Sequence, residues 1–328
     1  MKIMDFPFLI ITKSSEHVMK IDNHDIFKVK DIEFINIHNE KHSEGNSEIQ
    51  NFKEGLKNLI ALGFYFSFTY NLTQTKQRMF KIAEKNPVLN AEEKYFWNYH
   101  LYRDFRENKI DNIFQVCMIY GYVGHYDEMI EDTDEFKLSK HELEVEEVNI
   151  NNKKLSKESK IPIDIILISR RSVNYAGTRY LSRGITDDGH VANFVETEMI
   201  IKLKNYTFSS VQLRGSAPVF FSQLGMTAQT TINRSPEMMG PAFLKHIKEC
   251  TTNYSMMLMI NLMNAFKPGE QVITQSFEKQ LKLNQMKNVR YLFFDFQTNT
   301  KYENYDKFES FPNENHVEET LNYFKFYC

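Results

Sequence analysis

The stretch from residue 169 to residue 223 constrains the fold of this chain most. It opens with an arginine-rich block that contains no acid and runs into the turn signal Asp187-Asp188-Gly189. Two strand-like runs follow, Val191–Leu203 and Tyr206–Leu213, and the second leads into the loop Arg214–Pro218. The pattern predicts paired strands bordered by loops that carry guanidinium groups.

These guanidinium groups are candidate ligands for an oxyanion. A planar guanidinium binds two oxygens at once, and phosphate is the anion that best suits a loop in which arginine stands beside glycine and serine. Arg214, next to Gly215 and Ser216, is the foremost candidate. The predicted substrate-binding set is Arg170, Arg171, Arg179, Arg183, Arg214 and Ser216. Pairing of these arginines with Glu196, Glu198, Asp187 and Asp188 is the structural alternative.

The same stretch resembles the signature of the SAC-domain phosphoinositide phosphatases. The matching pieces, in order, are Ser169-Arg170-Arg171-Ser172, Ala176-Gly177-Thr178-Arg179-Tyr180, Arg183-Gly184, the run from Gly189 to Glu198, Arg214-Gly215-Ser216 and Ser222-Gln223. One position departs from the family pattern, because Phe221 stands where the family usually has tryptophan before Ser-Gln. Further matches, such as Phe96-Trp97-Asn98 and Phe294-Asp295-Phe296, extend the resemblance over nearly the whole chain.

The resemblance implies hydrolysis of a phosphate monoester on an inositol lipid, without a metal or other cofactor. The family's nucleophile is a cysteine in a loop of the form Cys-x5-Arg-Thr/Ser. Backbone N–H groups of such a loop hold the phosphate oxygens and lower the pKa of the thiol, and the arginine stabilises the transition state. The resemblance also implies a cytoplasmic protein peripheral to endomembranes, either ER and Golgi or endosomal, with a phosphoinositide headgroup as partner.

No cysteine of this chain opens such a loop. Val123 stands six residues after Cys117, Met256 stands six residues after Cys250, and Cys328 is the last residue. We therefore expect a truncated sequence or, as the second possibility, a catalytically inactive relative that binds phosphoinositides or acts as a scaffold. Truncation is favoured because the arginine-rich motifs are intact. In both cases we expect residues 1–328 alone to be inactive, with no catalytic residue assigned.

Composition excludes several other classes. The net charge of −3 gives no global basic field for nucleic acid. The three cysteines have no spacing typical of a zinc site or a disulfide framework, which fits a reducing compartment. The longest apolar run, Met256–Phe266, is interrupted by two asparagines and is too short to cross a membrane. The acidic tract 126–148 is interpreted as a solvated surface segment.

The order of apolar runs predicts an α/β or α+β fold. A β-rich N-terminal subdomain, residues 1–150, is expected to pack on the first part of a mixed α/β catalytic subdomain, residues 151–328, with a polar linker at 149–160. Four short strands are expected at Phe6–Thr12, His17–Ile21, Ile26–Val29 and Ile32–Ile37. Farther along, helices are expected at Phe52–Leu62, Ala242–Thr251 and Glu270–Leu281, and strands at Ile161–Ile168, Ser255–Leu262 and Val289–Phe296.

Overall fold

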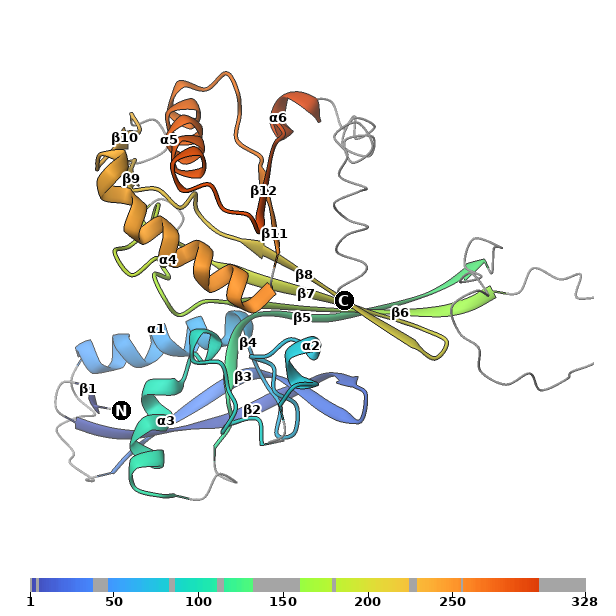
Figure 1. Ribbon diagram of the computed structural model, residues 1–328. Helices are drawn as coiled ribbons and strands as arrows, with labels where there is room; N and C mark the ends of the chain where they lie inside the picture. The colour runs from blue at the N-terminus through green and yellow to red at the C-terminus, as the bar shows by residue number, and fades with distance from the viewer. Residues whose placement is uncertain are drawn as a thin grey trace, which may run out of the picture. The chain divides into compact units, whose positions relative to one another are not determined.

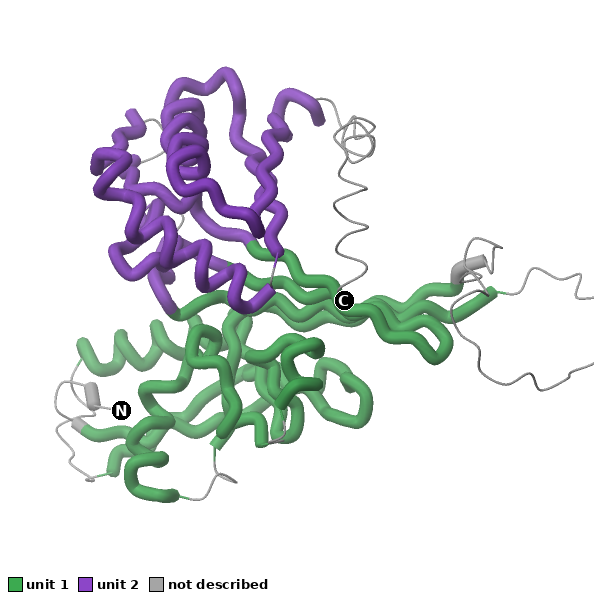
Figure 2. The backbone as a smooth tube through the Cα atoms, viewed as in Figure 1, with its two compact units in different colours: residues 1–173, 195–213 green, residues 174–194, 214–328 purple. Residues whose placement is uncertain are grey.

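The computed structural model describes residues 2–3, 6–37, 47–82, 86–110, 115–131, 160–178, 181–223, 229–254 and 256–300. They belong to two compact units, which Figure 2 shows in different colours. Unit 1 comprises residues 1–173 and 195–213, and unit 2 comprises residues 174–194 and 214–328. The combination of a large sheet with helices confirms the predicted mixed α/β class.

Unit 1 is built on an eight-stranded sheet in which every strand lies beside its neighbours in sequence (Figure 1). The strand pairs from β1–β2 to β6–β7 are antiparallel, so this sheet is a meander in which strands that follow each other in sequence pair. The strands are β1 Lys2–Ile3, β2 Phe6–Ile21, β3 His24–Asn36, β4 Phe64–Phe66, β5 Met118–Glu131, β6 Lys160–Arg171, β7 Val195–Leu203 and β8 Tyr206–Arg214.

The expectation of four short N-terminal strands was wrong. The chain forms one long hairpin, β2–β3, whose turn lies at Asp22-Asn23, where Asp22 has a φ of 54°. The Ser14-Ser15 pair, which looked like a turn, lies at register shifts inside β2. A bulge accommodates the extra residues while the strand continues, so turn-forming residues alone did not mark a chain reversal.

The helices of unit 1 are α1 Ser47–Gly63, α2 Lys76–Met79, the 3-10 turn η2 Glu93–Tyr95 and α3 Tyr99–Glu107. Leu56 and Ile60 of α1 pack on a core formed by Val29, Phe64 and Phe66. The predicted helix at Phe52–Leu62 is therefore confirmed and begins earlier, because Ile49 in the first turn of α1 packs on Phe8 of β2 and Phe34 of β3.

Unit 2 contains a parallel strand–helix–strand segment. Strand β11 Met257–Asn261 pairs in parallel with β12 Val289–Phe293, and α5 Pro268–Asn284 connects them. The remaining elements are β9 Phe221–Ser222, β10 Thr231–Ile232, α4 Pro236–Tyr254 and α6 Phe296–Asn299. The helix expected at Ala242–Thr251 begins earlier, at Pro236, so Pro241 lies inside α4 and not at its start.

The predicted boundary between residues 150 and 151 lies outside the described residues, as does most of the acidic tract. The strands on its two sides, β5 and β6, pair directly from Gly121–Arg170 to Glu131–Lys160 and belong to unit 1. Among the helices that the structure describes, none is long and apolar enough to cross a membrane.

Candidate functional site

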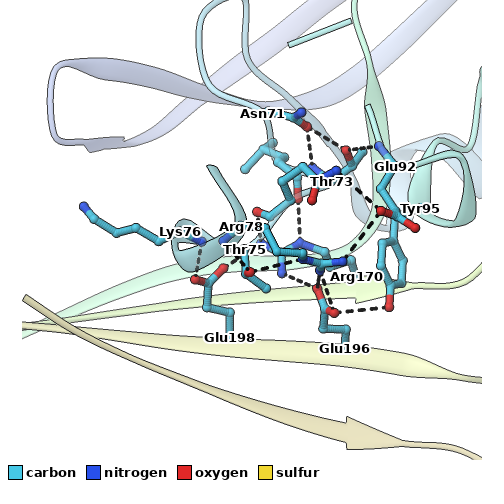
Figure 3. A network of polar contacts seen from close by, with 12 residues as sticks. Asn71, Thr73, Thr75, Lys76, Arg78, Glu92, Tyr95, Arg170, Glu196 and Glu198 are labelled. Carbon is cyan, nitrogen blue, oxygen red and sulfur yellow. Dashed lines mark hydrogen bonds and ion pairs between the residues drawn. The ribbon is translucent and has the colours of Figure 1, made fainter. Parts of the chain in front are cut away.

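Arg170 lies at the centre of a buried polar network in unit 1 (Figure 3). It is a cross-strand partner of Glu196, and Glu198 lies on the same face of β7 two residues farther on. The guanidinium Nη1 donates to Glu196 at 2.7 Å and Nη2 donates to Glu198 at 2.8 Å. Its Nε and Nη2 also donate to the carbonyl oxygens of Leu72 and Gln74, at 2.6 and 3.0 Å.

A segment about 100 residues earlier in the chain completes this network. Arg78 of α2 donates to both carboxylate oxygens of Glu196, at 2.7 and 2.8 Å. Glu198 accepts the backbone N–H of Lys76 at 2.7 Å and the hydroxyl of Ser209 at 2.8 Å. The Tyr95 hydroxyl donates to Glu196 at 3.4 Å. The network therefore joins β6, β7 and β8 to the loop before α2.

The buried surroundings of the network shift the pKa of Arg170 and of Tyr95. Burial acts to lower the pKa of Arg170, but Glu196 and Glu198 outweigh it and raise the pKa above its usual value. Burial, with Glu196, raises the pKa of Tyr95 well above normal, so its phenol stays protonated and donates. Arg170 is fully buried and its fork is occupied by protein acceptors. These contacts match the structural alternative for Arg170.

The other arginines of the block occupy different surroundings. Arg171, the last residue of β6, lies with its guanidinium carbon 5.8 Å from the centre of the Tyr120 ring, and its carbonyl accepts the indole N–H of Trp97 at 2.7 Å. Arg183 belongs to unit 2, where its carbonyl accepts the Tyr175 hydroxyl at 2.8 Å. Arg179 lies outside the described residues.

The structure brings Ser216 close to the segment that carries Arg183. The Ser216 hydroxyl accepts the N–H of Gly184 at 2.8 Å, and its own N–H donates to Ala192 at 3.0 Å. Gly184 has a φ of +70°, and a Cβ there would lie 2.4 Å from the carbonyl oxygen of Val219, so backbone conformation and close packing both require the glycine of the Arg-Gly pair. Arg214, at the end of β8, is exposed. These contacts join two loops, one from Gly184 to Ala192 and one at Ser216, and Arg214 lies two residues before Ser216.

The turn from Asp187 to His190 contacts helix α4 and Arg234, which lies two residues before that helix. Asp187 accepts a bidentate pair of hydrogen bonds from Arg234, whose guanidinium carbon lies 3.7 Å from the centre of the Phe220 ring. His190 lies 4.0 Å from Glu249 of α4. The Asp-Asp-Gly turn is confirmed, with Gly189 at a φ of +87°. These contacts explain the Asp, Gly and His of the motif as loop anchors.

Asp295 organises the loop ends of β11 and β12. Its carboxylate accepts the backbone N–H of Ala265 at 2.8 Å and of Thr298 at 3.0 Å, as well as the Thr298 hydroxyl at 2.8 Å. Burial acts to raise the pKa of Asp295, but these hydrogen bonds and the charge of Lys267 outweigh it and lower the pKa. The residue is therefore an ionised cap.

Within the described ranges, no cluster of three His, Cys, Asp or Glu side chains could hold a metal ion.

Comparison with known proteins places these motifs in a family. The family model described as the SacI homology domain matches residues 1–301. The chain belongs to the SacI homology domain family. Among curated relatives, it is 32% identical over 250 residues to "Phosphatidylinositide phosphatase SAC2" of Danio rerio, which covers 74% of the chain and 22% of the relative.

Two further relatives cover more of this SacI homology chain. It is 28% identical to "Phosphatidylinositol-3-phosphatase SAC1" of Saccharomyces cerevisiae, over 88% of the chain and 43% of the relative. It is 27% identical to "Phosphoinositide phosphatase SAC6" of Arabidopsis thaliana, over 90% of the chain and 47% of the relative. The chain thus spans between about a fifth and a half of the length of these curated relatives.

The cysteines within the described part of this SacI homology chain do not resemble nucleophiles. Cys117 and Cys250 are both buried. Burial raises the pKa of the Cys117 thiol well above its usual value, which disfavours the reactive thiolate. Cys250 lies inside α4, with its sulfur 4.0 Å from His246 Nε2. Cys328 lies outside the described residues.

Proposed function

We propose that this chain is part of a phosphoinositide phosphatase that acts on a phosphate monoester of an inositol lipid. The observation that carries the proposal is the match to the SacI homology domain over residues 1–301, together with relatives named as phosphoinositide phosphatases. The hydrogen bonds between Gly184, Ala192 and Ser216 in unit 2 add support, because they join the segment that carries Arg183 to the segment that carries Arg214 and Ser216.

The chemistry of hydrolysis needs a group that residues 1–328 do not supply. A thiolate must attack phosphorus while backbone N–H groups and an arginine hold the remaining oxygens. No cysteine here is followed by five residues and an arginine. We therefore propose that the polypeptide 1–328 alone binds the headgroup without hydrolysing it. As the second candidate function, the same properties describe a phosphoinositide-binding scaffold.

We assign the predicted substrate-side residues different roles in this proposal. Arg214 is exposed and is the foremost phosphate contact, with Arg183 and Ser216 of the same unit in supporting positions. Arg171 and Arg179 stay predictions from the sequence. We assign Arg170 a structural role that positions β6 and β7, because its guanidinium donates hydrogen bonds to Glu196 and Glu198. The lipid headgroup on a cytoplasmic membrane surface, of the ER, Golgi or endosomes, is the partner we propose.

Hydrolysis is tested on purified 1–328 with phosphatidylinositol monophosphates, by release of inorganic phosphate. We expect no turnover above the buffer background. The control is the Cys328→Ser, Cys250→Ser double variant, which should be equally inactive. Turnover by the wild-type chain that this double variant abolishes would show that one of these cysteines is catalytic, and would overturn the proposal that 1–328 lacks the nucleophile.

Binding is tested by co-sedimentation of 1–328 with vesicles that contain a phosphatidylinositol monophosphate. We expect Arg214→Ala to weaken binding about tenfold, because one charge-assisted contact to phosphate is lost. The matched control is Arg290→Ala, which removes an exposed arginine of the same unit. Equal loss in both variants would indicate a diffuse charge effect and would remove Arg214 from the proposed site.

A further inference from the structure

Strands β11 and β12 of unit 2 form a two-stranded parallel sheet that is apolar on both faces. Strand β11 is apolar at four consecutive positions, Met257–Ile260, and β12 at three, Tyr291–Phe293. A continuous apolar run, without alternation, is typical of a strand that is covered on both sides, and parallel sheets occur almost only with both faces covered. The two strands therefore require a cover on each face.

Helix α5 covers one of these faces. Tyr291 of β12 packs on Phe277 of α5, with ring centroids 5.5 Å apart, and its hydroxyl donates to Glu278 at 3.0 Å. The side-chain amide of Asn261 in β11 donates to the Thr274 hydroxyl at 3.1 Å. Because side chains alternate along a strand, the odd-numbered residues of both strands lie on the face toward α5.

The opposite face, called the open face below, is only partly covered. It consists of Leu258, Ile260, Arg290 and Leu292, and Leu262 and Phe294 continue it after the strands. Phe294 is buried, but Ile260 and Leu262 are 49% and 48% exposed. Arg290 carries the single charge of these six positions, is exposed, and makes no ion pair within the described part of the chain.

The exposed area of the open face is too small for an interface with a separate protein. Two half-exposed and two partly buried aliphatic side chains leave on the order of 200 Å² of apolar surface in contact with water. A stable complex buries about 800 Å² on each partner. A segment of the same chain needs less area, because its tether gives it an effective concentration of about millimolar.

The segment of residues 301–328, which lies outside the described residues, has the sequence pattern of an amphipathic helix near its end. Val317, Leu321 and Phe324 stand at i, i+4 and i+7, which places them on one side of a helix. Asn315 precedes them, and asparagine is a favoured residue at a helix N-cap. The sequence therefore predicts a helix over residues 316–327.

The length and the charge of this segment match the open face. A helix of 12 residues, 316–327, spans about 18 Å, and the five residues of β11 span about 17 Å. The 15 residues 301–315 reach up to about 50 Å, so they can lead the helix back along the strands. The segment holds six acidic residues and three lysines, and its net negative charge complements Arg290.

We propose that residues 316–327 form a helix that packs Val317, Leu321 and Phe324 on the open face. The parallel sheet then lies between α5 on one face and this C-terminal helix on the other, which covers its apolar strands on both sides. The helix removes Ile260 and Leu262 from water and brings acidic residues of the segment near Arg290.

Hydrogen exchange followed by mass spectrometry on purified 1–328 tests the docking. We expect the amides of 316–327 to exchange about tenfold faster in Ile260→Asp than in the wild type, because a charge on the open face excludes the apolar side of the helix. The matched control is Val272→Asp, which changes a 39% exposed aliphatic residue on α5 and should leave this exchange unchanged.

A variant of the segment itself decides the case in which Ile260→Asp unfolds unit 2. Leu321→Asp should also speed the exchange of 316–327 about tenfold, while α5 keeps the exchange of the wild type. Fast exchange of 316–327 in the wild type would overturn the proposal. Slow exchange that persists in folded Ile260→Asp, or in Leu321→Asp, would overturn it as well.

Cross-linking locates the helix on the open face. In a Cys328→Ser background, Ile260→Cys is combined with Thr320→Cys, and the two cysteines of the described residues are buried and should not react. A short bismaleimide should link this pair within one chain, whereas the pair Val272→Cys, Thr320→Cys should stay unlinked. Equal linking of both pairs, linking of neither, or links that form only between two chains would each overturn the proposal.

Discussion

At the scale of single residues, Arg170 shows how a motif residue is committed to structure. Its guanidinium makes contacts to two carboxylates and two carbonyls while it is fully buried. Sequence reasoning named Glu196 and Glu198 as possible partners because they follow closely in the chain. It missed Arg78, Tyr95 and the loop carbonyls, which come about 100 residues earlier and are brought close only by the pairing of β4 with β5 and of β5 with β6.

We expect Arg170→Met to destabilise the chain strongly. The substitution leaves two carboxylates buried with only Arg78 to balance them, and removing one partner of a buried ion pair costs about 3–5 kcal/mol. The measurement is urea unfolding followed by tryptophan fluorescence, since Trp97 lies in unit 1 and donates to the neighbouring residue Arg171. Arg214→Met is the control, because Arg214 is exposed and should change stability by less than about 0.5 kcal/mol.

At the scale of elements, Gly189 and Asp295 determine how two loops pack on the helices beside them. Gly189 packs its Cα against α4, where a Cβ would lie 2.8 Å from Lys245 Cβ and 2.9 Å from His246 N. Asp295 caps α6 and also accepts the N–H of Ala265 in the loop after β11. The glycine, the aspartate and the strands were evident in the sequence. Their partners on α4 and in the loop after β11 were not, because such contacts depend on tertiary packing.

Two glycine substitutions distinguish the effect of close packing on stability from the effect of backbone entropy. Gly189→Ala should lose more than about 1–2 kcal/mol, since it combines a positive φ with a steric clash. Gly55→Ala, in the middle of α1, has no atom within 4 Å of the added methyl and should gain about 0.5–1 kcal/mol. Thermal unfolding of both variants beside the wild type provides the comparison. Opposite signs are expected, and equal signs would contradict the packing around Gly189.

The cap at Asp295 should depend on pH. Its pKa is lowered in the folded chain, so its stabilisation is present above the unfolded pKa of about 3.9 and is lost as pH falls through the folded value. Asp295→Asn should therefore lower the melting temperature at pH 7, because an amide has no charge and only one oxygen to accept the hydrogen bonds from Ala265 and Thr298. The difference from the wild type should shrink as pH falls below 4. A difference that is constant from pH 7 to pH 3 would exclude an ionised cap.

At the scale of the whole molecule, the sequence indicated the α/β class and most elements, and the predicted boundary between two subdomains at residue 150 stays a prediction. Strands β6 and β7 follow the predicted boundary at residue 150, yet they complete the sheet of unit 1. Strand pairing across a long connection leaves little trace in a single sequence. The polar composition of residues 149–160 predicted a linker and could not show that the strands on its two sides are partners.

We expect a fragment of residues 1–150 to be poorly soluble. Without β6, the 14 residues of β5 become an unpaired edge strand with exposed Tyr122, Tyr126 and Met129. A fragment of residues 1–213 keeps every residue of unit 1 and should remain soluble, with slow amide exchange in β5. Soluble fraction and hydrogen exchange measure both expectations. A folded, soluble 1–150 would instead support the predicted boundary.

The chain passes between its two units three times, after residues 173, 194 and 213. A recombination event that transferred either unit to another gene would therefore need breakpoints at each of these passages. Neither unit is therefore one contiguous block of sequence that a single insertion or deletion could move.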